Sequence, residues 1–399
     1  MPANVRRIND LVEKYDVDAL IASSPENVVY TSDLPNWAVA LAEYIFVVLP
    51  REPSAGRKLI APMSMADLVA ATDFGVDEVL LYGTYPFEIA RTDEPQSGAA
   101  DLKIQRLISE RAAGGEPLQV LVQCLKDQGL QNKMLGIDHE GLSPRVLDLI
   151  VKSLSRATIK DSSELFLRAR MVKTKEEVQR VRRSIRATEK GIGTILEKAR
   201  IGIAERELAA EFEKTLIDEG ASPGITVLAF GNGTGYVNPE PSGRTLSIGN
   251  LIKFDGGGFY KAYVTDIART FVFGEPTNEQ VRTYRAIQEG ESEALKHIKP
   301  GVKACEVFKV AVETVRRQGI PHYRRHNCGH GIGMKVYEPP FIAPNDETPL
   351  EEGMVLCVET PYVELGHAGF IVEDTVLVTE SGCELLSTLD TELVTLAVR

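Results

Sequence analysis

The segment IKFDGGGFYKAYVTDIART, residues 252–270, places Asp255 and Asp266 on two consecutive predicted strands joined by a glycine-rich turn. In an antiparallel hairpin, residues that flank the turn can face the same side of the sheet and point at the same ion. An unpaired carboxylate in such a hairpin is costly to bury, and a bound metal ion would remove that cost. The segment therefore predicts a strand hairpin that carries two metal ligands.

Three residues further along the chain extend this set. His330 lies in HNCGHGIGMKVYEPP, where glycines let backbone and ligand approach closely. Glu359 in GMVLCVETPYV and Glu373 in GFIVEDTVLV lie on two more predicted strands, joined by VELGHAG. Four carboxylates and one imidazole suit two hard to borderline divalent ions that share bridging oxygens. Such a pair activates water near neutral pH, which predicts a metal-dependent hydrolase.

The alternative is that these five positions are unrelated surface acids and a loop histidine. The second strand of each pair, TDIARTFVF and VEDTVLV, places its acid beside an apolar run that should be buried. We therefore interpret the five residues as one site.

Composition describes an ordinary globular protein and excludes some partners. The 399 residues, 43% hydrophobic and 26% charged, suffice for two domains. A net charge of −12 argues against nucleic acid or an anionic membrane surface, since both need a basic face. Five scattered cysteines without a CxxC pair predict a reducing compartment. Because no signal core or membrane span is apparent either, we expect a cytoplasmic protein.

Two domains are predicted from the order of the elements. Residues 1–165 alternate helical spacing with short strand-like runs such as DALIAS, YIFVVLP and RKLIAP, which predicts an α/β domain. Within it, the polar and Gly/Pro-rich segment 83–117 is predicted to be an insertion or surface loop. Residues 166–399 begin with a predicted helix over 175–199, because Thr174 and Glu177 form a capping-box pattern. Further helices are predicted at 205–219, 278–296 and 304–318, and each helix pair is followed by strands, which hints at an internal duplication.

The five candidate ligands resemble those of the pita-bread metallopeptidases: Xaa-Pro dipeptidases, aminopeptidase P and methionine aminopeptidases, with creatinase as a metal-free relative. The resemblance rests on the order Asp, Asp, His, Glu, Glu, on the 11-residue gap between the aspartates, and on the later gaps. It extends over the whole chain, because dipeptidases and creatinases also carry an N-terminal α/β domain with a segment like SPENVVYTSDL, residues 24–34. It implies an α/β creatinase-like N-terminal domain, an α+β pita-bread catalytic domain and a homodimer.

The resemblance also implies a role for each ligand. Asp255 would bind one metal ion, and Asp266 and Glu373 would bridge both ions. His330 and Glu359 would complete the second ion, and Glu359 would also take the proton of the attacking water. Oxygen-rich sites favour harder ions, so we expect two Mn²⁺ ions, with Co²⁺ or Zn²⁺ as substitutes.

Three positions depart from the family pattern. Tyr337 replaces a histidine seven residues after the metal-binding one, and Asn238 replaces a histidine about 17 residues before the first aspartate. Ile371 replaces an arginine two residues before the last glutamate. Tyr337 can still donate a hydrogen bond to an oxyanion, as a catalytic group, and Asn238 can bind a substrate carbonyl or carboxylate. Neither replaces imidazole as a proton shuttle.

Three more residues are site candidates. His326, four residues before His330, matches a family histidine and is predicted to assist catalysis; the alternative is a structural loop histidine. His367, between the two glutamates, is a substrate-binding candidate or an ordinary surface-loop residue. Trp37, the only tryptophan, would line a substrate pocket if the N-terminal domain borders the partner subunit's site as in dimeric relatives; the alternative is plain packing.

The predicted function is hydrolysis of a C–N bond by a dinuclear metal centre, most simply in a dipeptidase or aminopeptidase that acts near proline. The three departures support a second hypothesis, a hydrolase of a small non-peptide amide or cyclic amidine, as creatinase and ectoine hydrolase are. A third hypothesis is a non-enzymatic binding protein, against which the retention of all five ligands argues. The expected partner is thus a dipeptide or another small molecule.

Overall fold

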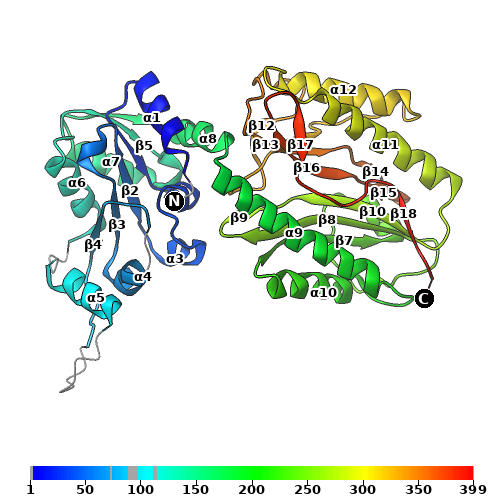
Figure 1. Cartoon of the computed structure of the whole chain (residues 1–399), viewed down its shortest axis with the longest axis horizontal. Helices are drawn as coiled ribbons and strands as arrows, with labels where there is room; N and C mark the ends of the chain where they lie inside the picture. Colours follow the sequence, from blue (N-terminus) through cyan, green and yellow to red (C-terminus); the bar gives the residue numbers. More distant parts are fainter. Residues whose placement is uncertain (1–2, 72–73, 89–97, 111–114, 399) are drawn as a thin grey trace. The chain divides into compact units, whose positions relative to one another are not determined.

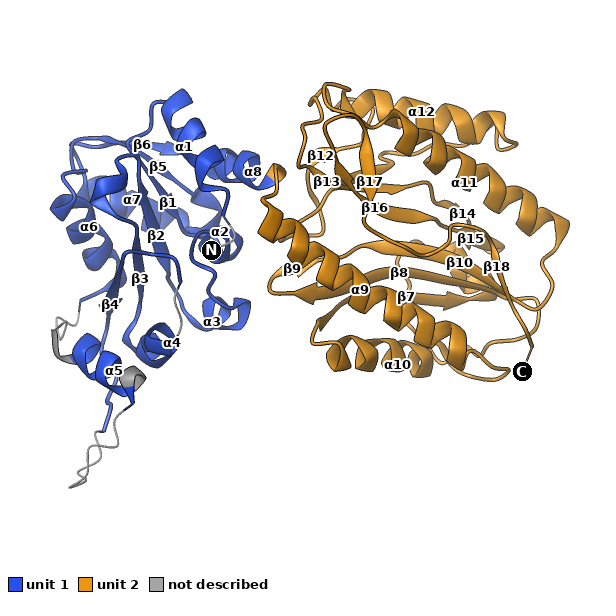
Figure 2. Ribbon diagram, in the orientation of Figure 1, with its two compact units in different colours: residues 1–170 blue, residues 171–399 orange. Residues whose placement is uncertain are grey.

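The computed structural model describes residues 3–71, 74–88, 98–110 and 115–398. The chain divides into two compact units, Met1–Arg170 and Met171–Arg399 (Figure 2). Each unit contains its own sheet and its own apolar core. Among the described residues, no helix combines the length and the apolar composition that crossing a membrane requires.

The first unit is built on a six-stranded mixed sheet in the order β4-β3-β2-β1-β5-β6 (Figure 1). Its strands are β1 (Ala19–Ala22), β2 (Phe46–Pro50), β3 (Lys58–Pro62), β4 (Glu78–Tyr82), β5 (Met134–Ile137) and β6 (Thr158–Asp161). Its helices are α1 (Val5–Lys14), α2 (Pro25–Ser32), α3 (Asn36–Leu41), α4 (Ala66–Ala71), α5 (Ala99–Glu110), α6 (Pro117–Asp127), α7 (Pro144–Ser153) and α8 (Ser163–Met171). The apolar runs that predicted strands supply its core, including Ile21, Phe46 and Ile60. The α/β class predicted for this region is confirmed.

The prediction of an insertion or loop over residues 83–117 needs a correction, because α5 occupies part of this segment. The Gly- and Pro-rich flanks dominated its composition and hid the helical spacing of the residues between them. α5 packs on α4, so this part of the segment belongs to the fold of the unit. Residues 89–97 and 111–114 of the segment lie outside the described residues.

The second unit is built on a curled sheet in the order β12-β11-β13-β16-β10-β8-β7. Its path consists of β7 (Ser222–Phe230), β8 (Leu251–Tyr260), β10 (Ile267–Phe273), β11 (Gly329–Gly331), β12 (Glu338–Phe341), β13 (Val355–Glu359) and β16 (Glu373–Val378). Three short strands pair with this path: β9 (Tyr263–Val264), β17 (Cys383–Leu385) and β18 (Val394–Leu396). A separate hairpin joins β14 (Tyr362–Glu364) to β15 (Ala368–Phe370).

Four helices accompany this sheet: α9 (Lys175–Lys198), α10 (Glu205–Asp218), α11 (Asn278–His297) and α12 (Ala304–Arg317). The predicted start of α9 is confirmed, since the Thr174 hydroxyl accepts from the Glu177 backbone at 3.2 Å while the Glu177 carboxylate accepts from the Thr174 backbone at 2.7 Å. α9 and α10 pack on β8 and β7, and α11 packs on β13 and α12 (Figure 1). The two helix pairs leave the other face of the central strands for the site.

Candidate metal centre

Strand register brings the five predicted ligands together. Ala268 of β10 lies opposite Asp255 of β8 on one side and opposite Glu373 of β16 on the other. Glu373 in turn lies opposite Glu359 of β13. Because residues in register share a face and alternate residues return to it, these acids all project from the same side of the sheet. His330 joins them from β11, where it lies opposite Cys357, two residues before Glu359.

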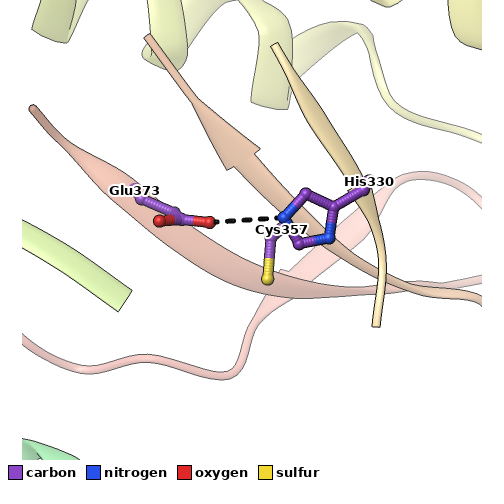
Figure 3. Close-up of side chains that lie close together, drawn as sticks. All are labelled: His330, Cys357 and Glu373. Carbon is purple, nitrogen blue, oxygen red and sulfur yellow. Dashed lines mark ion pairs between the residues drawn. The ribbon is translucent and has the colours of Figure 1, made fainter. Parts of the chain in front are cut away.

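The distances define one compact cluster. Asp255, Asp266 and Glu373 each offer a carboxylate oxygen, and these oxygens lie within 4.8 Å of one another. The Nε2 atom of His330 lies 3.9 Å from Oδ2 of Asp266. The same atom lies 4.0 Å from Oε1 of Glu373 (Figure 3). Asp266 and Glu373 are therefore the two members that face both Asp255 and His330.

The carboxyl groups of this cluster are largely buried, and their charges repel one another. Burial, followed by the charges of Asp255 and Glu359, raises the pKa of Asp266 well above its usual range. Burial, followed by Asp266 and Glu359, has the same effect on the pKa of Glu373. Among the described residues, Oδ1 of Asp266 accepts no hydrogen bond. Nothing in this part of the protein compensates these two carboxylates, as expected for groups that bind cations.

His330 is oriented as a metal ligand. Its Nδ1–H donates to the carbonyl of Gly331 at 3.0 Å, which leaves the Nε2 lone pair directed at the acids. Burial lowers the pKa of His330 to about 4. The imidazole is therefore neutral near pH 7, and a neutral imidazole is the form that coordinates a metal ion.

Glu359 differs from the other acids, because it has a cation beside it. Nη2 of Arg325 donates to Oε1 of Glu359 at 3.2 Å. Burial raises the pKa of Glu359 to about 7, and Arg325 opposes that rise. Its side chain is 13% exposed, whereas those of Asp266 and Glu373 are 7% and 2% exposed. Glu359 is thus more exposed than Asp266 and Glu373, and Asp255 is likewise only partly buried.

Cys357 also lies against His330 and Glu373 (Figure 3). Its thiol donates to the backbone carbonyl of Asp266 at 3.6 Å. Burial, with Glu373 and Asp266 next, raises the pKa of the thiol well above its usual range. Cys357 therefore remains a protonated thiol, and the five oxygen and nitrogen ligands are the better donor set for a metal.

Sequence comparisons identify the family. The profile of metallopeptidase family M24 matches residues 179–380, just over half of the chain, and the creatinase/prolidase N-terminal domain matches residues 5–172. The chain belongs to metallopeptidase family M24. As an M24 protein it is a metal-dependent hydrolase, and its pita-bread fold is confirmed.

Individual relatives agree with this assignment. A Pyrococcus furiosus Xaa-Pro dipeptidase is 34% identical over 56% of this M24 chain, and the match spans 65% of that relative, just under two thirds of its length. An Xaa-Pro dipeptidase of Pyrococcus horikoshii is 30% identical over 66% of this chain and 75% of the relative. The solved structure of an Xaa-Pro dipeptidase from Bacillus anthracis shares the fold, with a TM-score of 0.81, 21% identity and coverage of 98% of this chain and 99% of that one.

The structure places Tyr337, the first departure from the family pattern, directly beside the cluster. Its ring centroid lies 4.3 Å from that of His330. Burial, followed by the charges of Asp266 and Glu359, raises the pKa of Tyr337 above its usual value. Tyr337 is 57% exposed and keeps its proton near neutral pH, and the catalytic role predicted for it stays a prediction.

The other two departures lie in different surroundings. Asn238 is exposed and follows Tyr236 and Val237, whose carbonyls accept hydrogen bonds from the ammonium group of Lys253. Lys253 is two residues from Asp255 on β8 and therefore projects from the same face. Ile371 is buried and contributes no polar side-chain group.

Among the described residues, the remaining candidates make no hydrogen bond or ion pair with the cluster. His326 is exposed and makes no hydrogen bond or ion pair with another described side chain. His367 forms a surface ion pair with Glu279, 3.4 Å between Nε2 and Oε1. Trp37 lies on α3 of the other unit with 61% of its surface exposed. The roles predicted for these three residues stay predictions.

Two cations near the cluster, Lys253 and Arg325, were not predicted from the sequence. Lys253 had a detectable signal, because a residue two positions before a strand ligand shares its face. Arg325 had none, because its partner Glu359 is 34 residues away in a different strand.

Proposed function

We propose that this M24 chain binds two divalent metal ions through Asp255, Asp266, His330, Glu359 and Glu373, and hydrolyses the peptide bond before proline in short peptides. One observation carries the proposal. Asp266 and Glu373 contact both Asp255 and His330, which is the arrangement expected of two bridging carboxylates between one ion at Asp255 and a second at His330.

The donor set fits two such ions. Four carboxylates carry four negative charges when ionised, two divalent cations carry four positive charges, and the neutral imidazole supplies the nitrogen. Oxygen-rich ligands favour harder ions, which supports Mn²⁺, with Co²⁺ or Zn²⁺ as substitutes. Bound ions would supply Lewis acidity toward the scissile carbonyl and would lower the pKa of water.

The remaining chemistry falls to the side chains. Glu359 is partly exposed and its pKa is raised to about 7, so it is the acid proposed to receive a proton from water. The Tyr337 hydroxyl donates a hydrogen bond to the oxygen on which charge develops. His326 assists proton transfer, and Asn238 and His367 contact the substrate. If the chain forms a homodimer, Trp37 of one subunit lines the substrate pocket of the other.

The proline preference is taken from the Xaa-Pro dipeptidases that this chain resembles. We further propose a cytoplasmic homodimer, on the sequence features and family resemblance given above.

A second candidate function follows from Tyr337, Asn238 and Ile371. The raised pKa of Tyr337 prevents it from moving protons near pH 7, and Ile371 supplies no charge for a substrate carboxylate. These features favour a small non-peptide amide or cyclic amidine over an Xaa-Pro bond.

Metal content and hydrolysis should be measured together on manganese-reconstituted protein beside Glu373→Ala. Two ions per chain with Xaa-Pro cleavage that the variant loses would support the peptidase. Two ions without cleavage of any Xaa-Pro dipeptide would shift the proposal to small amides. A wild-type protein that binds no metal ion would contradict both.

A further inference from the structure

Arg325 is a cation at the edge of the cluster to which no role has been assigned. It lies in the loop before β11, and its contact with Oε1 of Glu359 is a charge-assisted hydrogen bond of 3.2 Å. The Arg325 and Glu359 side chains are only 15% and 13% exposed, so solvent screens the pair less than it screens a surface ion pair.

The guanidinium group is held from a second direction. Its Nε–H donates to the carbonyl of Asn327 at 3.1 Å. Two contacts on different nitrogens fix the plane of a rigid guanidinium, which a lysine in the same place would not achieve. The orientation of Arg325 is therefore set by its own loop.

The same loop also holds the backbone of Glu359, whose N–H donates to the carbonyl of Cys328 at 3.1 Å. Cys328 is two residues before His330 in the chain. A single segment thus carries one candidate ligand, His330, and forms hydrogen bonds with the backbone N–H and with one carboxylate oxygen of a second, Glu359.

A carboxylate has two oxygens, and Arg325 occupies only one of them. With Oε1 held, the rotation of the Glu359 carboxyl group is restricted and Oε2 is left for another partner. Residues that orient a metal ligand in this way contribute strongly to metal affinity, commonly about 10- to 100-fold.

We propose that Arg325 is a positioning residue of the metal centre, which holds Oε1 of Glu359 so that Oε2 binds the ion shared with His330. The inference rests on the proposed function, because it takes Glu359 as a metal ligand. In this role Arg325 orients Glu359, one of the five proposed metal ligands.

Arg324 provides a matched control. It is the adjacent residue, is exposed, and makes no hydrogen bond or ion pair with another described side chain. Arg324→Gln removes the same charge from the same loop as Arg325→Gln. Arg325→Lys keeps the charge and loses the two-sided contact, so it separates orientation from electrostatics.

The experiment is calorimetric titration of the metal-free, full-length proteins with Mn²⁺, together with thermal unfolding of the same samples. We expect two ions for the wild type and for Arg324→Gln. Arg325→Gln should bind one ion about 10- to 100-fold more weakly and the other within about 3-fold of wild type. Arg325→Lys should lie between them. If Arg325→Gln does not fold, the lysine variant, compared with wild type, decides the question.

Four results would overturn the inference. Unchanged Mn²⁺ affinity in Arg325→Gln and Arg325→Lys would show that Glu359 needs no orienting partner. Tighter binding would show that Arg325 competes with the ion as a counter-charge. Unchanged affinity with a higher KM for dipeptides, but not for their C-terminal amides, would make Arg325 a substrate contact.

If the wild type binds two ions but cleaves no Xaa-Pro bond, only the proposed substrate fails and the titration still tests Arg325. A wild type without Mn²⁺ binding rejects both.

Discussion

Glu373 and Asp374 are consecutive residues of β16, and both are almost completely buried. Because neighbouring residues of a strand project from opposite faces, they enter two different clusters of buried acids. Glu373 meets Asp266 and other carboxylates, with no Lys or Arg nitrogen within 4 Å of its carboxylate oxygens among the described residues. Asp374 meets Arg269, whose Nη2 lies 2.6 Å from Oδ1.

In the cluster around Asp374, a side chain of the protein itself compensates the buried carboxylate. Arg269 is one of the largest fully buried side chains, and its hydrogen bonds reach one carboxylate and four backbone carbonyls: Asp374, Ala268, Glu373, Leu389 and Asp390. The hydroxyl of Ser387 donates to the same Asp374 oxygen at 2.5 Å. Burial, followed by Asp374, raises the pKa of the neighbouring Glu291 well above its usual range.

The difference shows that the two faces of the sheet treat buried carboxylates differently. On the Asp374 face, a cation of the chain compensates the acid and ties β10, β16 and the segment after β17 together. On the Glu373 face, the described residues place two cations near the cluster, Lys253 and Arg325, and neither forms an ion pair with the carboxylate of Asp266 or Glu373. The second arrangement is stable when cations come from outside the chain, which is the physical basis for a metal centre.

Arg269→Met should have the largest effect on stability. The variant keeps most of the side-chain volume but leaves Asp374 as an uncompensated buried charge and strips four backbone carbonyls of a donor. We expect a loss of about 3–5 kcal/mol in the free energy of unfolding, measured by urea denaturation.

Arg182→Met is the control, since Arg182 pairs with Glu384 at 2.8 Å near the surface. That pair should contribute less than about 1 kcal/mol. Equal losses in the two variants would mean that burial does not distinguish the Arg269 cluster.

Metal ions should stabilise the folded protein through the Glu373 face. At a free Mn²⁺ concentration about 1,000-fold above Kd, linkage predicts a gain of about 4 kcal/mol for each bound ion relative to protein in a chelator, measured by urea denaturation. Glu373→Gln should lose most of this gain, whereas Arg182→Met should keep it. A full gain in Glu373→Gln would contradict the assignment of Glu373 as a bridging ligand.

The neighbouring substitutions Glu373→Gln and Asp374→Asn should change stability in opposite directions without metal. The pKa of Glu373 is raised in the folded state, so at pH 8 its ionised form destabilises the fold, and an isosteric amide removes that cost. One pKa unit corresponds to about 1.4 kcal/mol, so we expect a gain of about 1 kcal/mol or more. Asp374→Asn breaks a compensated pair and should cost about 1–3 kcal/mol. Urea denaturation in a chelator measures both, and two losses would reject the comparison.

The sequence identified what depends on local pattern. The cap of α9 and the acids beside apolar strand runs are local, and both predictions agree with the structure. Pairing between distant segments was not accessible. Arg269 and Asp374 are 105 positions apart, and nothing in DIART or VEDTV tells which of the neighbouring acids will meet the arginine. The opposite roles of Glu373 and Asp374 follow from strand register, which forms only when β10 and β16 pair.

Glu177 offers an intermediate case between the two clusters. It is buried at the start of α9, where the Tyr263 hydroxyl donates to it at 3.0 Å and Lys173 lies nearby. Burial raises its pKa from 4.5 to about 7. A raised folded pKa means that its contribution to stability is fully present below about pH 4.5 and is lost as the pH rises to about 7.

Glu177→Gln keeps an acceptor for Tyr263 and for the Thr174 backbone but cannot ionise. Relative to the variant, the wild type should therefore lose stability between about pH 4.5 and 7, by at most about 1.4 kcal/mol per pH unit, and the difference should be constant at higher pH. Urea denaturation of both proteins in a chelator at pH 5, 6, 7 and 8 measures this, because titrations common to both cancel. A constant difference over the whole range would mean that Glu177 is ionised throughout, with Lys173 compensating it as Arg269 compensates Asp374.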